Sequence, residues 1–397
     1  MNTQDRYQEL SRELDADRCI EAAKKATGLS RFDSDRFYEP LRKLLDCAAR
    51  EVDFHPQGLI DFKNYIVHAL VNRLRMQQDY ERHPEILDED VSDPIIIIGL
   101  GRCGSTKLHK VFSAPDDVQK TLFWRMFNPA RFPDAKPGQP DPRIAAAGSC
   151  EMVSEDKPVL DAAHHMEEGE VEEEWMLNFL TFDDWGLAYK VPVPSYFDWL
   201  MTRPRSASIE NYREVKRMLQ YLQWQDGGKR GRPWVLKSVG HAAYMDALME
   251  CYPNATLVQA HRDLLSTIPS HAKLLSGIWS IYSNPLDPHF IGQEMQRMMA
   301  AVCARFLEAR DRLGLNDRIL DVDYEQVRTD PMSIVKEVYR RAGRALSPES
   351  EQKMAAWHAT NEQGAFGKHV YSLEEFGLSE AGINKAFAEY IRRFVRR

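Results

Sequence analysis

The sequence contains no run of about 18 apolar residues, so no segment is expected to span a membrane. It also lacks an excess of basic residues: 52 lysines and arginines stand against 60 aspartates and glutamates, giving a net charge of −8. Nonspecific nucleic-acid binding needs a clustered basic surface, so we expect no nucleic-acid partner. The amino-terminal stretch is charged and helix-like and lacks the apolar core of a signal peptide, and we therefore expect a cytoplasmic protein.

Cysteine is scarce and scattered along the 397 residues. The six cysteines are Cys19, Cys47, Cys103, Cys150, Cys251 and Cys303, and no two of them form a C-x-x-C pair. This distribution argues against a zinc ribbon and a disulfide scaffold, and it fits a reducing compartment. The chain also shows no internal repeat and no low-complexity segment. Its length allows one large domain with additions, or two domains.

The character of the sequence changes near residue 90. Residues 60–74 carry apolar side chains at helical spacing on a polar background, and residues 1–90 are predicted to form a helical N-terminal region. Pro94 is then followed by four consecutive isoleucines, Ile95 to Ile98. β-Branched residues bounded by proline and glycine predict a strand that is buried on both faces. A second region, residues 91–397, is predicted to form an α/β domain.

Strands and helices alternate along this second region. Strands are predicted at residues 234–237, 255–260 and 318–324, and helices at residues 106–112, 242–250, 267–275 and 292–313. The alternation predicts an α/β fold with a central, mostly parallel sheet, helices on both faces, and helical additions at the N- and C-terminal ends. Two intervening segments are predicted as an irregular connection, residues 128–149, and as an acidic helix, residues 155–182.

A glycine-rich loop, residues 99–106, follows the first strand and opens a helix. Such a turn is an anion site, because free backbone N–H groups and the helix dipole both favour negative charge. The spacing matches the nucleotide P-loop, G-x-x-x-x-G-K-[ST], but Ser105 stands where that loop has its lysine. The missing lysine disfavours ATP hydrolysis and phosphoryl transfer, and Arg102 supplies a cation from within the loop instead.

The run from Pro94 to His109 resembles the 5′-phosphosulfate loop of sulfotransferases that use 3′-phosphoadenosine 5′-phosphosulfate (PAPS), particularly their bacterial-type branch. Gly101 replaces the proline that is usual there, Ser105 replaces a threonine, and Lys107 replaces an apolar residue. The resemblance implies a P-loop NTPase-like sulfotransferase fold in residues 91–397. It also implies that loop residues bind the 5′-phosphosulfate, namely Arg102, Cys103, Gly104, Ser105, Thr106 and Lys107.

A second stretch resembles the part of that family that binds the 3′-phosphate of PAPS. In the family, a strand ends in arginine and a serine follows eight residues later on the next helix; Arg262 and Ser270 have this spacing. A guanidinium and a hydroxyl near a helix N-terminus suit a phosphate. Residues 319–331 resemble a structural segment of the family. Residues 367–377 resemble the C-terminal segment that closes over the nucleotide, where Lys368 is a further candidate for the 3′-phosphate.

Sulfuryl transfer requires a base that takes the acceptor's proton, and cations around the transferring group. Some bacterial-type relatives carry a catalytic histidine about 60 residues after the loop arginine, and His165 lies 63 residues after Arg102. Histidine suits a base near neutral pH, and a buried carboxylate is the alternative. The candidates for the base are therefore His164 or His165, then His241, then Glu173 or Glu174. Arg102 and Lys237 are the candidate cations, and Lys237 ends a strand where ligands of open α/β sheets bind.

These features predict a PAPS-dependent sulfotransferase that acts on a hydroxyl or amine of a small-molecule, lipid or sugar acceptor. PAPS is the expected co-substrate. No metal is expected, because the spacing of His164, His165 and the following glutamates fits no ligand motif. Two alternatives stay open: a P-loop-like nucleotide kinase or NTPase, and a noncatalytic nucleotide-binding protein. The sequence does not fix the oligomeric state, and a homodimer is one of the states that it allows.

Overall fold

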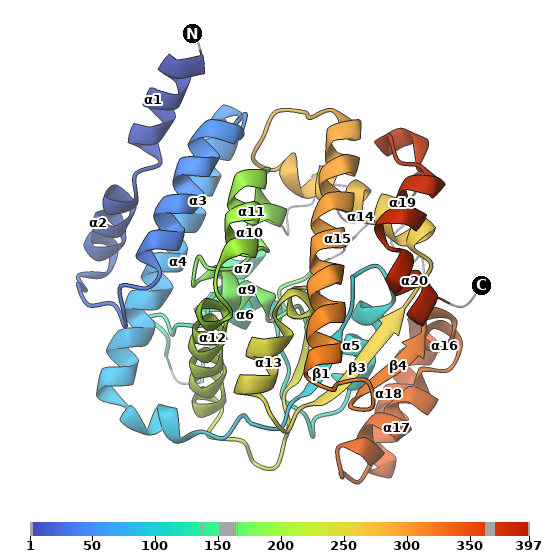
Figure 1. Cartoon of the computed structure of the whole chain (residues 1–397). Coiled ribbons are helices and arrows are strands. Elements are labelled where there is room, and N and C mark those ends of the chain that lie inside the picture. The colour runs from blue at the N-terminus through green and yellow to red at the C-terminus, as the bar shows by residue number, and fades with distance from the viewer. Residues whose placement is uncertain (1–2, 137, 151–163, 165, 362–369, 396–397) are drawn as a thin grey trace.

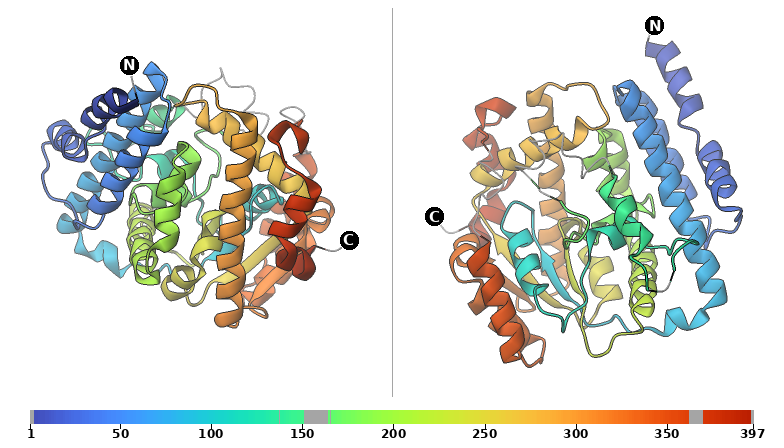
Figure 2. Two further views of the ribbon diagram at one scale, coloured as in Figure 1. Left: turned by 45° about the horizontal axis from the view of Figure 1, so that its top comes forward. Right: turned by 180° about the vertical axis from the view of Figure 1, so that it is seen from behind.

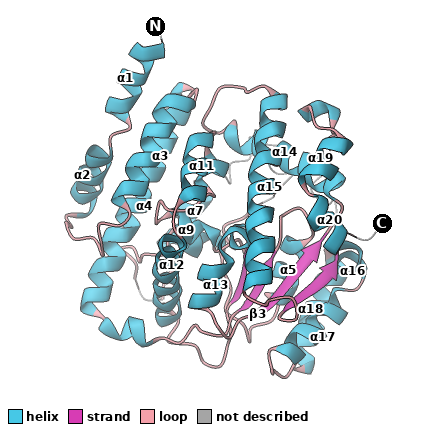
Figure 3. Cartoon of the chain, viewed as in Figure 1, coloured by secondary structure: helices cyan, strands magenta, loops and turns pink. Residues whose placement is uncertain are grey.

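The computed structural model describes residues 3–136, 138–150, 164, 166–361 and 370–395. Helices surround a small central sheet (Figure 1; Figure 3). The first and the last helices of the chain lie at opposite sides of the molecule, which Figure 2 shows from two further directions. No helix in the described ranges combines the length and the apolarity that a bilayer crossing requires.

The central sheet contains four strands, all paired in parallel. They are β1 (Ile95–Ile98), β2 (Val235–Ser238), β3 (Thr256–His261) and β4 (Ile319–Asp323). Their order across the sheet is β2-β1-β3-β4. The predicted α/β class and parallel sheet are confirmed, and each predicted strand lies within one residue of the observed one at either end. The carboxyl ends of all four strands meet at one edge, where ligands of such sheets bind.

The four isoleucines of β1 are fully buried because both faces of the sheet are covered. Successive side chains of a strand point to opposite faces. Ile96 and Ile98 accordingly belong to the large core, which includes helices α12 to α15, whereas Ile95 and Ile97 belong to a smaller core with α5, α17 and α18.

The helical elements of this part of the chain are α5 (Ser105–Phe112), α6 (Phe123–Phe127), α7 (Pro142–Gly148), α9 (Trp175–Phe179), α10 (Leu187–Lys190), α11 (Pro194–Thr202), α12 (Arg205–Gln225), η2 (Gly240–Tyr244), α13 (Met245–Cys251), α14 (Leu264–Trp279) and α15 (Pro288–Arg312), followed by α16 (Tyr324–Thr329), α17 (Pro331–Arg341), α18 (Pro348–Thr360), η3 (Glu374–Phe376), α19 (Glu380–Ala386) and α20 (Ala388–Phe394).

The N-terminal region is helical, as its apolar spacing predicts. Its elements are α1 (Thr3–Glu13), α2 (Ala16–Thr27), α3 (Tyr38–Glu51), α4 (Pro56–Arg82) and η1 (Pro84–Asp88). Arg73 of α4 is buried and donates to Asp33 over 2.6 Å, to Glu214 of α12 over 2.9 Å, and to the carbonyl oxygen of Leu180 over 3.2 Å. Removing one partner of such a buried pair costs about 3–5 kcal/mol, so these bonds fix α4 to the rest of the molecule.

Two segments differ from the sequence prediction. The connection at 128–149 contains the helix α7, which Asp141 caps by accepting from the backbone N–H of Arg143. The predicted acidic helix at 155–182 is not formed in its described residues before α9, because that backbone pairs elsewhere: Glu172 donates its N–H to the carbonyl of Thr121 over 2.8 Å, and Phe123 donates to the carbonyl of Glu170 over 2.8 Å. Residues 170–172 therefore run beside residues 121–123 instead of forming a helical turn.

Candidate active site

The glycine-rich loop joins β1 to α5 through a left-handed turn. Gly101, Arg102 and Gly104 have φ angles of 76°, 53° and 89°. This backbone region is open to glycine but strained for arginine, and such strain concentrates at functional sites. The turn brings the loop to the N-terminus of α5, where Ser105 and Thr106 begin the helix. The predicted glycine-rich turn at a helix N-terminus is therefore present, in the form that suits an anion.

The two predicted phosphate-binding signatures are brought together. Arg102 donates from Nε to the Oγ atom of Ser270 on α14 over 3.1 Å. Arg262, directly after β3, donates to the carbonyl oxygen of Arg102 over 2.9 Å, and its guanidinium lies 4.2 Å from the ring centre of Tyr324. Segments that lie more than a hundred residues apart in the sequence thus form one basic cluster at the carboxyl edge of the sheet.

Other candidate residues from the sequence do not join this basic cluster or fall outside the described residues. Lys107 points away from the loop and donates to the carbonyl oxygen of Arg328 over 2.9 Å. Cys103 is buried beneath the turn, and burial raises the pKa of its thiol. Lys368, a candidate for the 3′-phosphate, and His165, a candidate base, lie outside the described residues.

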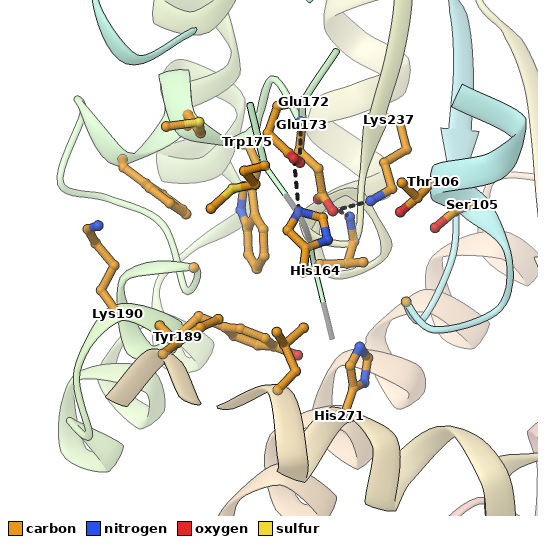
Figure 4. A pocket seen from close by; sticks show the side chains of 18 of the residues that line it. Ser105, Thr106, His164, Glu172, Glu173, Trp175, Tyr189, Lys190, Lys237 and His271 are labelled. Atoms are coloured by element: carbon orange, nitrogen blue, oxygen red, sulfur yellow. Dashed lines mark hydrogen bonds and ion pairs between the residues drawn. The ribbon is translucent and has the colours of Figure 1, made fainter. Parts of the chain in front are cut away.

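A pocket opens beside the loop, and Figure 4 shows its lining. Its polar side lies at the loop, with Ser105, Thr106 and Lys237. Most of its wall is apolar or aromatic. The lining residues are Tyr65, Gly101, Arg102, Ser105, Thr106, Phe127, His164, Met166, Glu172, Glu173, Trp175, Met176, Phe179, Gly186, Tyr189, Lys190, Lys237, Val239, His271, Leu274 and Ile278. Binding pockets commonly combine such an apolar wall with a few convergent polar groups.

Two consecutive glutamates each hold a polar partner at the pocket. Glu172 accepts from His164 Nε2 over 2.8 Å. Burial would raise the pKa of Glu172, but the charge and hydrogen bond of His164 and the charge of Lys237 outweigh it and lower the pKa to about 2. Glu173 pairs with the ammonium of Lys237, and its other oxygen accepts from the N–H of Val239 over 3.2 Å. Both carboxylates therefore lie beside the loop as acceptors of hydrogen bonds.

His241 does not line the pocket and pairs with the next glutamate, Glu174. Its Nε2 pairs with Glu174 over 2.5 Å, and its Nδ1 lies 2.9 Å from the hydroxyl of Tyr212. Glu174 also accepts from the backbone N–H of Lys237 over 2.7 Å. Burial raises the pKa of Glu174, but His241 and the N–H of Lys237 lower it by more. Neither His241 nor Glu174 lines the pocket, so this pair holds the end of β2.

His271 is a pocket residue that the sequence did not indicate. It follows Ser270 on α14 and is buried beside the loop. Burial, with the charges of Arg102 and Lys237, lowers the pKa of His271 to about 3, so the imidazole is neutral at pH 7. Its proximity to Ser270 was the available signal. Within the part of the chain that the structure describes, no cluster of three or more His, Cys, Asp or Glu side chains is arranged to hold a metal ion.

Comparison with known proteins relates this site to one family. The sequence matches the family described as "Sulfotransferase family" over residues 94–348. Sulfotransferase STF9 from Mycobacterium avium is 27% identical with a TM-score of 0.81, and the match covers 96% of this chain and 97% of that one. Sulfotransferase STF1 from Mycobacterium tuberculosis is 28% identical with a TM-score of 0.76, and the match covers 94% and 98%. No curated protein matches the sequence.

Proposed function

The chain belongs to the sulfotransferase family, and we propose that it transfers a sulfuryl group from PAPS to a hydroxyl or amine of a small-molecule, lipid or sugar acceptor. The observation that carries the proposal is the meeting of Arg262 and Ser270 with the loop at Arg102. PAPS has phosphate groups at two positions of one nucleoside. The loop with the N-terminus of α5 suits the 5′-phosphosulfate, and Arg262 with Ser270 suits the 3′-phosphate.

The reaction moves SO₃ between two nucleophiles. The bond from sulfur to the 5′-phosphate oxygen breaks, a bond from sulfur to the acceptor oxygen or nitrogen forms, and 3′,5′-ADP leaves. The acceptor's proton passes to a base. Lys237 lies beside Ser105 and Thr106 at the pocket (Figure 4), where an ammonium offsets negative charge on the transferring group and on the leaving phosphate. Arg102 supplies a second cation from the loop.

We infer that His164 is the base. In the tautomer that donates from Nε2 to Glu172, the Nδ1 atom of His164 carries the lone pair that accepts a proton. Glu172 remains ionised at neutral pH and stabilises the imidazolium that forms. Both oxygens of Glu173, in contrast, are already engaged by Lys237 and by the N–H of Val239. Glu173 therefore serves to position Lys237.

Nucleotide titration tests the proposed donor. The wild-type protein is expected to bind 3′,5′-ADP without magnesium, and Arg262→Ala to weaken this binding about 10- to 100-fold through loss of a charge-assisted contact to phosphate. Arg392→Ala, an exposed arginine on α20 that pairs with Glu389, is the matched control and should leave the affinity unchanged. Magnesium-dependent binding of ATP in preference to 3′,5′-ADP would favour a nucleotide kinase or NTPase instead. Binding without transfer of labelled sulfate to any acceptor would favour a noncatalytic protein.

Gly101→Ala is expected to weaken 3′,5′-ADP binding by at least about tenfold, because its Cβ would displace the loop. That Cβ would lie 2.3 Å from His271 Nε2, and φ is 76°. Gly28→Ala is the control that separates backbone strain from the steric clash, because its φ is also positive, at 70°, but no atom lies within 4 Å of the added Cβ. Gly28→Ala is expected to lower the unfolding free energy by about 1–2 kcal/mol and to leave the affinity for 3′,5′-ADP unchanged. Equal nucleotide affinity of Gly101→Ala and wild type would show that the close contact with His271 does not shape the loop.

A further inference from the structure

His271 brings a buried imidazole to the loop end of the pocket. It lies on α14, one residue after Ser270, and is 2% exposed. Its ring lines the same pocket as Arg102 and Lys237, and Figure 4 shows it projecting from its helix toward the pocket. Burying a polar ring costs free energy unless the ring is hydrogen-bonded, so an imidazole in this wall needs a physical reason.

The edge of the imidazole that carries Nε2 lies against the loop. A Cβ atom at residue 101 would lie 2.3 Å from Nε2 and 2.6 Å from Cε1 of His271, so it is the lack of a side chain on Gly101 that lets this edge approach. Nδ1, in contrast, is enclosed and has no hydrogen-bond partner in the described part of the chain. The ring also meets Tyr189 edge-on, with the ring centres 6.2 Å apart at 83°. Nε2 is therefore the nitrogen that a ligand at the loop can reach.

The state of this ring is that of a hydrogen-bond donor. Burial, with the charges of Arg102 and Lys237, lowers the pKa of His271 to about 3, so the ring is too weak a base to take a proton at neutral pH. A neutral imidazole carries one N–H and one lone pair. A buried N–H without an acceptor is rarer in proteins than a buried acceptor without a donor, so we assign the lone pair to the enclosed Nδ1 and the proton to Nε2.

We propose that His271 donates a hydrogen bond from Nε2 to an oxygen of the sulfuryl group during its transfer, as a catalytic residue separate from the base. This inference rests on the proposed function, which assigns the loop to the 5′-phosphosulfate. The sulfuryl oxygens carry negative charge, toward which Arg102 and Lys237 supply cations. A neutral donor adds a hydrogen bond at this point without adding repulsion between cations. His271 keeps its proton throughout, while one sulfur–oxygen bond breaks and the bond to the acceptor forms.

Two amide variants of different reach test which nitrogen acts. The amide nitrogen of a glutamine side chain lies about where Nε2 of histidine does, and that of asparagine about where Nδ1 does. His271→Leu and His271→Asn are expected to lower kcat for the transfer of labelled sulfate about 10- to 100-fold, whereas His271→Gln should stay within about threefold of the wild type. The affinity for 3′,5′-ADP should change by less than about twofold in all three, because this nucleotide lacks the sulfuryl group. Retained binding also shows that the variants are folded.

The pH dependence of kcat separates a donor from a base. Because the imidazole of His271 stays neutral from about pH 5 to pH 9, His271→Leu should lower kcat by the same factor at every pH in that range. Loss of a base would change the shape of the profile instead. His83→Leu is the matched control, since His83 pairs with Glu85 outside the pocket, and it should keep both kcat and the profile.

Four results would overturn the role of His271 in a wild-type protein that transfers sulfate. They are full activity of His271→Leu, an active His271→Asn with an inactive His271→Gln, a loss of 3′,5′-ADP affinity as large as the loss of kcat, and an acid limb of the pH profile that disappears in His271→Leu. Each of them leaves the sulfotransferase function intact. A wild-type protein that binds 3′,5′-ADP and transfers no labelled sulfate would overturn the proposed function and this inference together.

Discussion

Lys237→Met is expected to lower kcat for sulfuryl transfer about 10²- to 10³-fold, with a much smaller effect on the affinity for 3′,5′-ADP. The ammonium of Lys237 lies between Glu173 and the start of α5, at the polar end of the pocket. A cation there acts on charge that develops as the bond to the 5′-phosphate breaks. Loss of the cation therefore raises the free energy of the transition state more than that of the bound nucleotide. Steady-state kinetics with labelled PAPS measures the effect on kcat, and titration measures the affinity.

The variant also leaves Glu173 without its ammonium partner, which costs stability. The Glu173 side chain is 15% exposed, so its unpaired charge lowers the unfolding free energy by less than the about 3–5 kcal/mol that is lost when a fully buried pair is broken. The double variant Lys237→Met with Glu173→Gln removes this unpaired charge, while the amide oxygen still accepts from Val239. We expect it to regain the unfolding free energy and not the activity. Recovery of activity in the double variant would mean that Lys237 only neutralises Glu173.

His164→Ala is expected to lower kcat about 10²- to 10⁴-fold, the usual contribution of a general base. The affinity for 3′,5′-ADP should not change, because His164 contacts Glu172 and the pocket rather than the basic cluster at Arg262. Added imidazole is expected to restore part of the activity, since it can occupy the space left by the side chain. A side chain that only supported the fold would not respond to imidazole.

Three variants test the assignment of the base. Glu172→Gln keeps the imidazole but removes the charge that holds it, and a loss of about tenfold or more in kcat is expected. His83→Ala removes an exposed histidine that pairs with Glu85 outside the pocket, and should be silent. Glu173→Gln should cost less than His164→Ala. A larger loss for Glu173→Gln, with His164→Ala nearly active, would move the base to Glu173.

The proposed donor half of the site could be predicted because its signals are local. Four β-branched residues, a glycine turn and a helix start are encoded within the run from Pro94 to Phe112, and the backbone itself forms the turn that we propose as the anion site. Arg262 and Ser270 are equally local, because both are fixed by the end of one strand and the next helix. Parallel pairing of β1 and β3 then brings the two motifs together without any further information from the sequence.

In the proposed acceptor half, single candidates such as His164 and Glu173 could be named, but their partners and the apolar wall could not be predicted, because long-range contacts form them. The acidic run predicts a helix, yet Glu172 and Glu173 contact separate partners because residues 170–172 pair with residues 121–123. Nothing near Lys190 indicates a pocket, since Tyr65 and Tyr282 reach it from distant parts of the chain. No periodicity within one segment contains that information.

The contribution of α4 to the pocket has a consequence for how such a molecule diversifies. Tyr65 lies before the stretch that matches the family, whereas the loop and Arg262 lie within it. If the pocket binds the acceptor as we propose, substitutions in α4 can reshape its wall while the proposed nucleotide-binding surface stays intact. Recombination between relatives at a point after α4 would then be expected to exchange acceptor preference and keep the donor. Arg73 sets the condition for such an exchange, because its partners Asp33 and Glu214 stand on opposite sides of that junction and must be inherited as a compatible pair.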